Sequence, residues 1–523
     1  MYPTTTQYDN SIYAPARTIT GRVTFVIVDV TAAGDILSIT TSTESTISNK
    51  SQLSNNVRST TYNLATLETD RFLLDGSFSF PDDTIVNNGE MGYVSDILCD
   101  SAGTFSPSID IVFVFNGPHS SVGITITFDV FNDEYAEDFT VTAYDASDVV
   151  IETVTVVGNT ESIVSALGQL ADYKKITIEI TKWNVGDRRA RIVEVDFGII
   201  QVYTDDSLIR FGLIEEMNPI SATLPSPEFD FTVDNSEKLF NILNPVGFYA
   251  YLQERQPIYA ELGVDIGAGV IEWVPVGEYL LSEWTSDQGS LTASFTARTN
   301  LDVLANFDYE QLTTVSRSLK ALAVAVFAIC GITNYDIDIA LDSITTNSLA
   351  KKTNCKNVLQ MIAIAGIANI FVTRDNVITL KQIPTPLGVA DDVIDFDNIY
   401  QEPKIVLEPP VKQVEVTYWT DLSTSAIDTV TSGETLGDVL KLEGNTLINT
   451  SARATAVANW ILAQKAYRAK YQINWRGNPA HELGDVIDIE NSFGSDMSAF
   501  ITKRNMTYQG YLQGQTEAHG AVN

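Results

Sequence analysis

Three histidines are the residues of this chain best suited to proton transfer near neutral pH or to zinc binding. They are His119, His481 and His519, far apart in the sequence, and none has a second histidine or a cysteine at metal-ligand spacing. His481-Glu482 begins like the HExxH motif of zinc proteases, but Asp485 stands where that motif needs its second histidine. We therefore expect no zinc site. We expect His119, in a Gly-Pro-His-Ser segment, to lie in an exposed loop.

The nucleophiles and carboxylates indicate no enzyme class either. The sequence has no G-x-S-x-G motif, no P-loop and no Rossmann fingerprint. Cys99, Cys330 and Cys355 form no CxxC pair, which predicts free, buried thiols in a protein folded in a reducing cytoplasm. Because 67 of the 523 residues are acidic, pairs of carboxylates occur throughout and cannot identify a glycosidase. We expect no catalytic residues and no enzyme activity.

Charge limits the classes of partner. The 67 acidic and 32 basic residues give a net charge of −35, which argues against a nucleic-acid-binding surface, because such a surface needs clustered Lys and Arg. Residues 201–300 alone hold 15 acidic and 4 basic residues, a formal charge of −11. The simplest interpretation is that this charge keeps the protein soluble.

Length and composition predict the elements. A chain of 523 residues is expected to form about three to five domains, and frequent Thr, Val and Ile favour strands. Met1–Asn10 contains no apolar run, so no signal peptide is expected. The apolar stretches Leu319–Ile332 and Val358–Val372 fall short of the roughly 20 residues of a membrane span and predict buried helices.

Short strands recur between residues 92 and 199, mostly at intervals of about 8–12 residues, and predict an all-β sandwich. One stretch in it, Ser162–Leu170, has a helix-like pattern, and the polar run Ser38–Thr61 before it predicts a loop or irregular hairpin. The predicted strands are 109–115, 123–130, 138–144, 149–157, 175–182 and 191–197. Farther along, apolar spacing predicts helices at 316–331, 354–368 and 453–468, with Asn354 as an N-cap.

One segment has a distinctive sequence. Residues 276–304 read VGEYLLSEWTSDQGSLTASFTARTNLDVL, two alternating strands joined by Asp-Gln-Gly. Further segments follow the same order as in one known family, and they read EFDFTVDN, RQPIYAELGV, NVLQMIAIAGIANIFVTRDNVITLKQI, RGNPAHELGDVIDIE and AFITKRNMTYQGYLQG. In these segments, and in the Gly484-Asp485 pair that begins a barrel strand, the chain resembles the phage tail baseplate hub family.

The resemblance implies a mainly β, multi-domain fold with α+β parts. Residues 1–85 and 200–300 are expected to form one discontinuous tube-like β-barrel, with the β-sandwich of 90–199 inserted into it. An α+β region over 301–390 and a second barrel with one helix over 391–523 would follow.

The resemblance also implies a function without catalysis. The chain would form a homotrimeric ring at the distal tip of a phage tail, in virions assembled in the host cytoplasm. Its partners would be the tail tube or distal tail protein, other tail-tip or fibre proteins and the tape-measure protein. It would take part in host attachment and let DNA pass without binding it. In that setting, acids of 201–300 that line the channel would repel passing DNA, because phosphate binding needs Lys and Arg. An alternative from a different class is a carbohydrate-binding or glycan-active protein of the cell surface, built from β-modules.

The insert carries the candidate ligand sites. The segments YVSDILCDSAGTF, GITITFD and DFTVTAYD resemble galactose-binding-like jelly rolls, which bind sugars, here a host surface glycan, at loops on one end. Trp183 could stack on a sugar ring while Asp187 and Arg188 bond its hydroxyls. Alternatively, Trp183 packs in the core and the arginines at 188, 189 and 191 pair with nearby acids or an adjacent subunit. Such folds also hold structural calcium, for which Asp96 and Asp100 are candidates; no other cofactor is expected.

Overall fold

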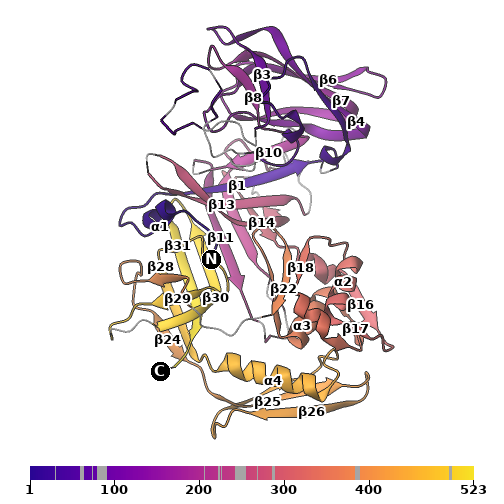
Figure 1. Ribbon diagram of the computed structural model, residues 1–523, viewed down its shortest axis with the longest axis vertical. Coiled ribbons are helices and arrows are strands. Elements are labelled where there is room, and N and C mark those ends of the chain that lie inside the picture. Colours follow the sequence, from indigo (N-terminus) through magenta and orange to yellow (C-terminus); the bar gives the residue numbers. More distant parts are fainter. Residues whose placement is uncertain are drawn as a thin grey trace. The chain divides into compact units, whose positions relative to one another are not determined.

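The structure is a computed structural model that describes the chain except residues 30, 59–63, 67, 74, 79–90, 205, 219, 222–223, 225, 242–254, 268, 286–288, 383–388, 494–496 and 523. It divides into two compact units, drawn in Figure 1: unit 1 is Met1–Thr24 with Val202–Asn523, and unit 2 is Phe25–Gln201. The described part holds 31 strands and four α-helices. The prediction of a mainly β fold with α+β parts is confirmed.

Unit 2 is a β-structure around one aromatic core. Its main sheet has the order β2-β4-β7-β5-β6, with β9 also on β4, and β3 pairs with β8 in a second sheet. The strands are β2 (Ile36–Thr41), β3 (Tyr93–Leu98), β4 (Thr104–Thr127), β5 (Ala136–Tyr144), β6 (Val150–Val156), β7 (Ile163–Trp183), β8 (Arg189–Ile192) and β9 (Glu194–Asp196). Side chains of both sheets, such as Phe113, Ile178 and Ile192, share one buried cluster. Alternate residues of β4 and β7 point into it, as period-2 patterning requires.

Two details of the sequence prediction for this unit were wrong. Ser162–Leu170 is not helical, because from Ile163 onward it forms the first part of β7, paired with β4 at Ala166↔Ile124 and its neighbours. Pairing and burial of Ala166 outweigh the helix preference of this stretch. The polar run Ser38–Thr61 also contains regular structure where described, since Ser38–Thr41 belongs to β2 and pairs with β4.

The largest sheet joins strands from both ends of the chain. Its order is β10-β1-β13-β14-β15-β12-β11-β30-β31-β28-β24, with β29 on β30 and β23 on β29. The bounds are β1 (Ile19–Val28), β10 (Gly198–Tyr203), β11 (Leu208–Glu216), β12 (Glu228–Asp234), β13 (Pro257–Asp265), β14 (Ile271–Thr285), β15 (Thr292–Arg298), β23 (Asp392–Ile394), β24 (Lys404–Leu407), β28 (Ala469–Trp475), β29 (Val486–Ile489), β30 (Met497–Tyr508) and β31 (Leu512–Gly520). The chain leaves unit 1 within β1 and returns within β10. The antiparallel pair β11–β30, from Phe211↔Tyr508 to Glu216↔Lys503, makes the two halves continuous.

Aromatic rings fill the buried face of the first half. Phe229 of β12 stacks on Tyr279 of β14 at 4.8 Å, and Phe231 stacks on Phe295 of β15 at 4.9 Å between ring centroids. β12 and β15 alternate strictly between buried and accessible side chains, so one face of this part of the sheet is apolar and the other polar. The turn predicted between β14 and β15 falls partly on 286–288, outside the described residues.

The three helices predicted after residue 300 are present. They are α2 (Leu319–Ile329), α3 (Cys355–Gly366) and α4 (Ser451–Lys465), whereas α1 (Thr6–Ile12) lies near the N-terminus. Asn354 caps α3 as predicted, its side chain accepting the backbone N–H of Asn357 at 2.8 Å. Helices α2 and α3 share one apolar core, and α4 lies along the sheet of β25 (Val411–Trp419), β26 (Ser425–Thr431) and β27 (Asp438–Leu442) (Figure 1). None of the helices in the described ranges is long and apolar enough to span a bilayer.

Compact unit 2 extends farther toward the N-terminus than the predicted insert of 90–199, because β2 is part of its main sheet. The finer division of the remainder into a barrel over 1–85 with 200–300, an α+β region over 301–390 and a second barrel over 391–523 stays a prediction.

The chain enters and leaves unit 2 at neighbouring positions, which predicts that unit 2 can be removed without unfolding unit 1. Asp29 N–H donates to the carbonyl of Phe197 at 2.9 Å, and β1 and β10 are neighbours in the sheet, so the entering and leaving strands lie side by side. A short Gly/Ser linker joining Thr24 to Val202 should therefore leave unit 1 folded, since each unit has its own core. Thermal melting of the excised protein is expected to retain a cooperative transition. The separate piece Phe25–Gln201 should also fold, and an insoluble remainder would contradict the division.

Candidate functional site

Trp183, predicted to stack on a sugar, lies in the core of unit 2. Its ring is 1% exposed and packs edge-on against Phe128 at 5.5 Å and Phe105 at 6.4 Å. A ring enclosed in this way offers no free face for stacking, so it occupies the core position that the sequence left open as the alternative.

Arg188 is held by an acid of its own unit. Its Nε lies 3.0 Å from Glu134, which also pairs with Arg71, and Arg191 pairs with Asp129 at 3.2 Å. Glu134, Asp129 and Arg191 are all buried, so these ion pairs are part of the interior of the unit. The role of Asp187 and Arg188 in binding a sugar stays a prediction.

Asp96 and Asp100, the two calcium candidates, lie in different surroundings. Asp100 Oδ1 accepts the backbone N–H groups of Ala102 at 2.9 Å and Thr104 at 2.8 Å, and so closes a tight turn. The carboxylate of Asp96 is exposed, 3.7 Å from Arg189. Within the described ranges, no three His, Cys, Asp or Glu side chains are arranged to hold a metal ion. Calcium binding at Asp96 and Asp100 stays a prediction.

The prediction that His119 lies in an exposed loop was wrong. It lies in β4, and its ring nitrogens are 2.9 Å from Asp29 and 3.0 Å from Asp35. Burial lowers the pKa of His119, but hydrogen bonds with Asp35 and Asp29 and their charges outweigh burial, so the pKa is raised above its usual 6.5. His119 thus links two segments of unit 2 through its two aspartates.

His481 is held in place by a buried hydrogen-bond network in unit 1. Its Nε2 lies 2.7 Å from Asp392, whose carboxylate also accepts from Tyr13 and from Asn478. Burial raises the pKa of Asp392, but the hydrogen bond and charge of His481 outweigh this and lower it overall. The incomplete HExxH motif is therefore a site of packing, with His481 joining the segments around residues 13 and 392.

Two buried arginines bind the segment just before Glu482. Arg374 Nη2 donates to the carbonyls of Pro479 at 2.8 Å and His481 at 2.9 Å, and Arg504 of β30 donates to the same two carbonyls. We call these two arginines and two carbonyls the arginine clamp. Spacing alone gave no sign of it, because its members come from segments that are far apart in the sequence.

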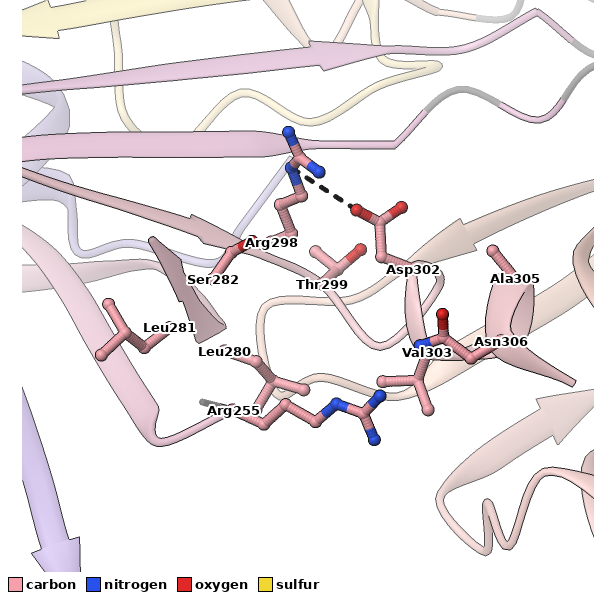
Figure 2. Close-up of a pocket in the computed structure, with 10 residues that line it drawn as sticks. All are labelled: Arg255, Leu280, Leu281, Ser282, Arg298, Thr299, Asp302, Val303, Ala305 and Asn306. Atoms are coloured by element: carbon pink, nitrogen blue, oxygen red, sulfur yellow. Dashed lines mark ion pairs between the residues drawn. The ribbon is translucent and has the colours of Figure 1, made fainter. Parts of the chain in front are cut away.

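A pocket of ≈ 370 Å³ is lined in part by residues of β14 (Figure 2). We call it the Arg255 pocket; its lining residues are Arg255, Leu280, Leu281, Ser282, Arg298, Thr299, Asp302, Val303, Ala305 and Asn306. Two backbone hydrogen bonds join the segment of Arg255 and Gln256 to β14. Arg255 N–H donates to the carbonyl of Leu281 at 2.7 Å, and Leu281 N–H donates to the carbonyl of Gln256 at 2.9 Å. Figure 2 shows Arg255 on one side of the pocket and Arg298 on the other.

The polar groups of this pocket are unequally satisfied. Arg298 lies 3.5 Å from Asp302 and 3.4 Å from Glu228, and Lys356 lies 3.2 Å from Asp302. Arg255 has φ +71° and is exposed, and its guanidinium has no hydrogen bond or ion pair in the described part of the chain. Thr299 is 4% exposed and its Oγ1 has no partner there either. The sequence gave no signal for this pocket, because it depends on a left-handed residue and on the turn after β15.

The acids of β12 lie on the polar face of the sheet. Glu228, Asp230 and Asp234 alternate along β12 with the buried Phe229, Phe231 and Val233. Burial, only partly offset by Arg210, raises the pKa of Asp230 above its usual value. This strand therefore presents a line of carboxylates opposite its aromatic face.

Comparison with known proteins finds no matching family model and no matching curated protein. Solved structures do resemble the chain. A tail protein from Neisseria meningitidis MC58 is 12% identical, covering 61% of this chain and 93% of that chain at a TM-score of 0.41. A 43 kDa tail protein of prophage MuSo2 from Shewanella oneidensis is 11% identical over 61% and 95%, with a TM-score of 0.40. The prophage tail protein gp18 from Listeria monocytogenes EGD-e is 11% identical over 61% and 91%, also at 0.40.

These are tail proteins, the class that the sequence resemblance indicates. At TM-scores below 0.5 and identities near one tenth, the likeness assigns neither a site nor an activity to this chain.

The position of Trp183 predicts the effect of removing it. Trp183→Ala should destabilise unit 2 by about 3–5 kcal/mol, the usual result of deleting a core aromatic side chain. Phe131→Ala, at an exposed site of the same unit, is the control and should change stability little. Urea unfolding of both variants measures the difference. A Trp183→Ala protein as stable as the unmutated chain would show that the ring is not a core residue.

His119 predicts a pH dependence of unit 2. Because the folded pKa of His119 is raised, its stabilisation is complete below about pH 6.5 and is lost as pH rises through the folded pKa. The pKa values of Asp29 and Asp35 are lowered, so their contribution is present above about pH 4 and is lost on acidification. The unfolding midpoint in urea should therefore fall as the pH rises into the alkaline range, and His119→Gln should reduce this fall.

Trp183 is the only tryptophan of unit 2, so its 19F signal in fluorotryptophan-labelled protein reports this unit alone. If the alkaline fall of the urea midpoint is unchanged in His119→Gln, His119 does not cause it.

Proposed function

We propose that this chain is a baseplate hub: a structural protein that forms a homotrimeric ring at the distal tip of a phage tail. The observation that carries the proposal is the continuous sheet of unit 1. Strands from residues 1–300 form one half and strands from 392–520 form the other, joined by β11–β30. One chain thus supplies two sets of antiparallel strands side by side.

Two sets of strands per chain suit a protein that joins two assemblies of different symmetry. Three copies present six sets of strands, which can meet a sixfold tail tube above while keeping threefold symmetry below. The joint between the sets is reinforced by charge as well as by backbone hydrogen bonds. Glu215 pairs with Arg504 and Glu216 with Lys503, at 3.2 Å for the latter, each across β11–β30. A rigid joint of this kind supports a ring that must keep its geometry under load.

The histidines support binding over catalysis. His119 and His481 are tied to aspartates, and His519 lies 3.1 Å from Thr502 and 3.5 Å from Glu408, with a pKa lowered by burial. In the described part each histidine is held within a network that links segments of its own unit. The function therefore follows from surfaces, and no cofactor is required for it.

The partners would be a tail tube or distal tail protein on one side and tail-tip, fibre or tape-measure proteins on the other, in the assembled virion. Unit 2 would serve host attachment, including attachment to a surface glycan. The carboxylates of β12 would line the channel and repel the phosphates of passing DNA, because like charges repel within about 8 Å at physiological salt. The DNA would therefore pass without binding to the wall.

The expected assembly is a trimer. Sedimentation equilibrium of the concentrated full chain should give three copies, and images of tail tips should show a threefold ring with the β12 acids on its inner wall. A protein that stays monomeric both alone and in tail particles would disprove the hub assignment. A ring with those acids on its outer wall would disprove only the channel role.

A further inference from the structure

Two of the three thiols of the chain lie against each other in unit 1. All three cysteines are buried and free, and the side chains of Cys330 and Cys355 share a hydrogen bond. Cys99 lies apart from them in unit 2, where its thiol donates to the carbonyl of Val185 at 3.3 Å. The sequence predicted buried thiols, but the spacing of Cys330 and Cys355 gave no sign that they meet.

The ends of two packed helices hold this pair of thiols in place. Cys330 is the C-cap of α2, and its backbone N–H donates to the carbonyl of Phe327 at 3.1 Å. Cys355 is the first residue of α3, and its backbone N–H donates to the carbonyl of Phe307 at 2.8 Å. The two helices pack together in one apolar core that contains both cysteines (Figure 1). Because backbone hydrogen bonds fix both residues, the two sulfur atoms stay within reach of each other.

The surroundings of the pair decide how it can react. Cys330 is 7% exposed and Cys355 is 0% exposed, so only a small molecule can reach either sulfur in the folded protein. Burial, and next the hydrogen bond with Cys355, raise the pKa of Cys330 to about 12, and burial raises the pKa of Cys355. Since the thiolate is the reactive form, oxidation is slow near neutral pH and becomes faster as the pH rises. Once one sulfur is oxidised, the group nearest to it is the second thiol.

We propose that Cys330 and Cys355 form a disulfide when the protein meets a small two-electron oxidant such as hydrogen peroxide. One thiolate attacks an oxygen of the peroxide, the O–O bond breaks, and that sulfur becomes a sulfenic acid. The second sulfur then attacks the first, the S–S bond forms, the S–O bond breaks, and the oxygen leaves as water. In total, two thiols lose two electrons and two protons, and one molecule of peroxide becomes two molecules of water.

The disulfide joins the end of α2 to the start of α3. Closing the loop between Cys330 and Cys355 restricts the unfolded chain, so the bond stabilises the part of unit 1 that contains these helices. A reducing cytoplasm keeps the pair as thiols, and the bond forms only in oxidising surroundings such as those outside a cell. The inference does not depend on the proposed hub or on its trimer, because both sulfur atoms belong to one chain.

The test treats the folded, full-length protein with hydrogen peroxide at several pH values, then unfolds it, alkylates the remaining thiols and maps its peptides by mass spectrometry. The peptides of Cys330 and Cys355 should be linked and lighter by two hydrogen atoms, Cys99 should be alkylated, and linking should be faster at higher pH. Thermal unfolding of the linked protein should show a midpoint higher by about 5 °C, and a reductant should reverse this shift. Cys330→Ala should show neither the link nor the shift, whereas the matched control Cys99→Ala should show both.

The unmutated chain alone can overturn the proposal, even if Cys330→Ala does not fold. Sulfinic acid at Cys330 or Cys355 without a linked peptide would mean that the two sulfur atoms cannot reach each other. Thiols that all stay free after prolonged treatment at high pH would equally refute it. A linked peptide whose formation leaves the unfolding midpoint unchanged would refute the stabilising role of the bond. None of these results bears on the trimer, so the two proposals fail separately.

Discussion

The arginine clamp is the interaction on which much of unit 1 depends. Arg374 follows the small sheet that contains β21 (Ala368–Val372), Arg504 belongs to β30, and both bind the carbonyls of Pro479 and His481. Arg374 also donates to the carbonyl of Pro275 in β14. One short segment thus joins both halves of the large sheet to the α+β part. Burial, and next the charge of Arg504, lower the pKa of Arg374. Placing two like charges together in the interior costs free energy.

That cost explains the acids around the clamp. Glu482 lies 3.2 Å from Arg374, and Glu215 pairs with Arg504 from the neighbouring strand β11. Two guanidinium groups at the same carbonyls would repel each other without these carboxylates, and leaving either charge unpaired in the interior is strongly unfavourable. Because Glu215 also lies at the β11–β30 joint, the clamp and the joint between the sheet halves stabilise each other. Charged side chains thus hold together segments of unit 1 that are far apart in the sequence.

Sequence patterns predicted the elements that depend on neighbours along the chain. The Asn354 cap, the buried helices α2 and α3, and the alternation of β15 follow from local spacing, and the structure has them. Patterns failed where a partner distant in sequence decides. Ser162–Leu170 became strand because β4 was available to pair with it, and His119 became buried because Asp29 and Asp35 lie nearby. The two interpretations of Trp183 could not be separated by spacing, since stacking on a sugar and packing in a core need the same ring.

The same limit explains why the candidate site was invisible in the sequence. The Arg255 pocket exists because Arg255 adopts a left-handed conformation, Leu281 holds it to β14, and the turn after β15 brings Thr299 and Asp302 to the opposite wall. None of these residues forms a motif. A missing partner does not mark them either, because other buried polar atoms of the described chain also lack one, among them Arg191 Nη2, Arg453 Nη2 and His481 Nδ1. The lining of the pocket is brought together by strand pairing and by one left-handed residue, so it is visible only in the tertiary structure.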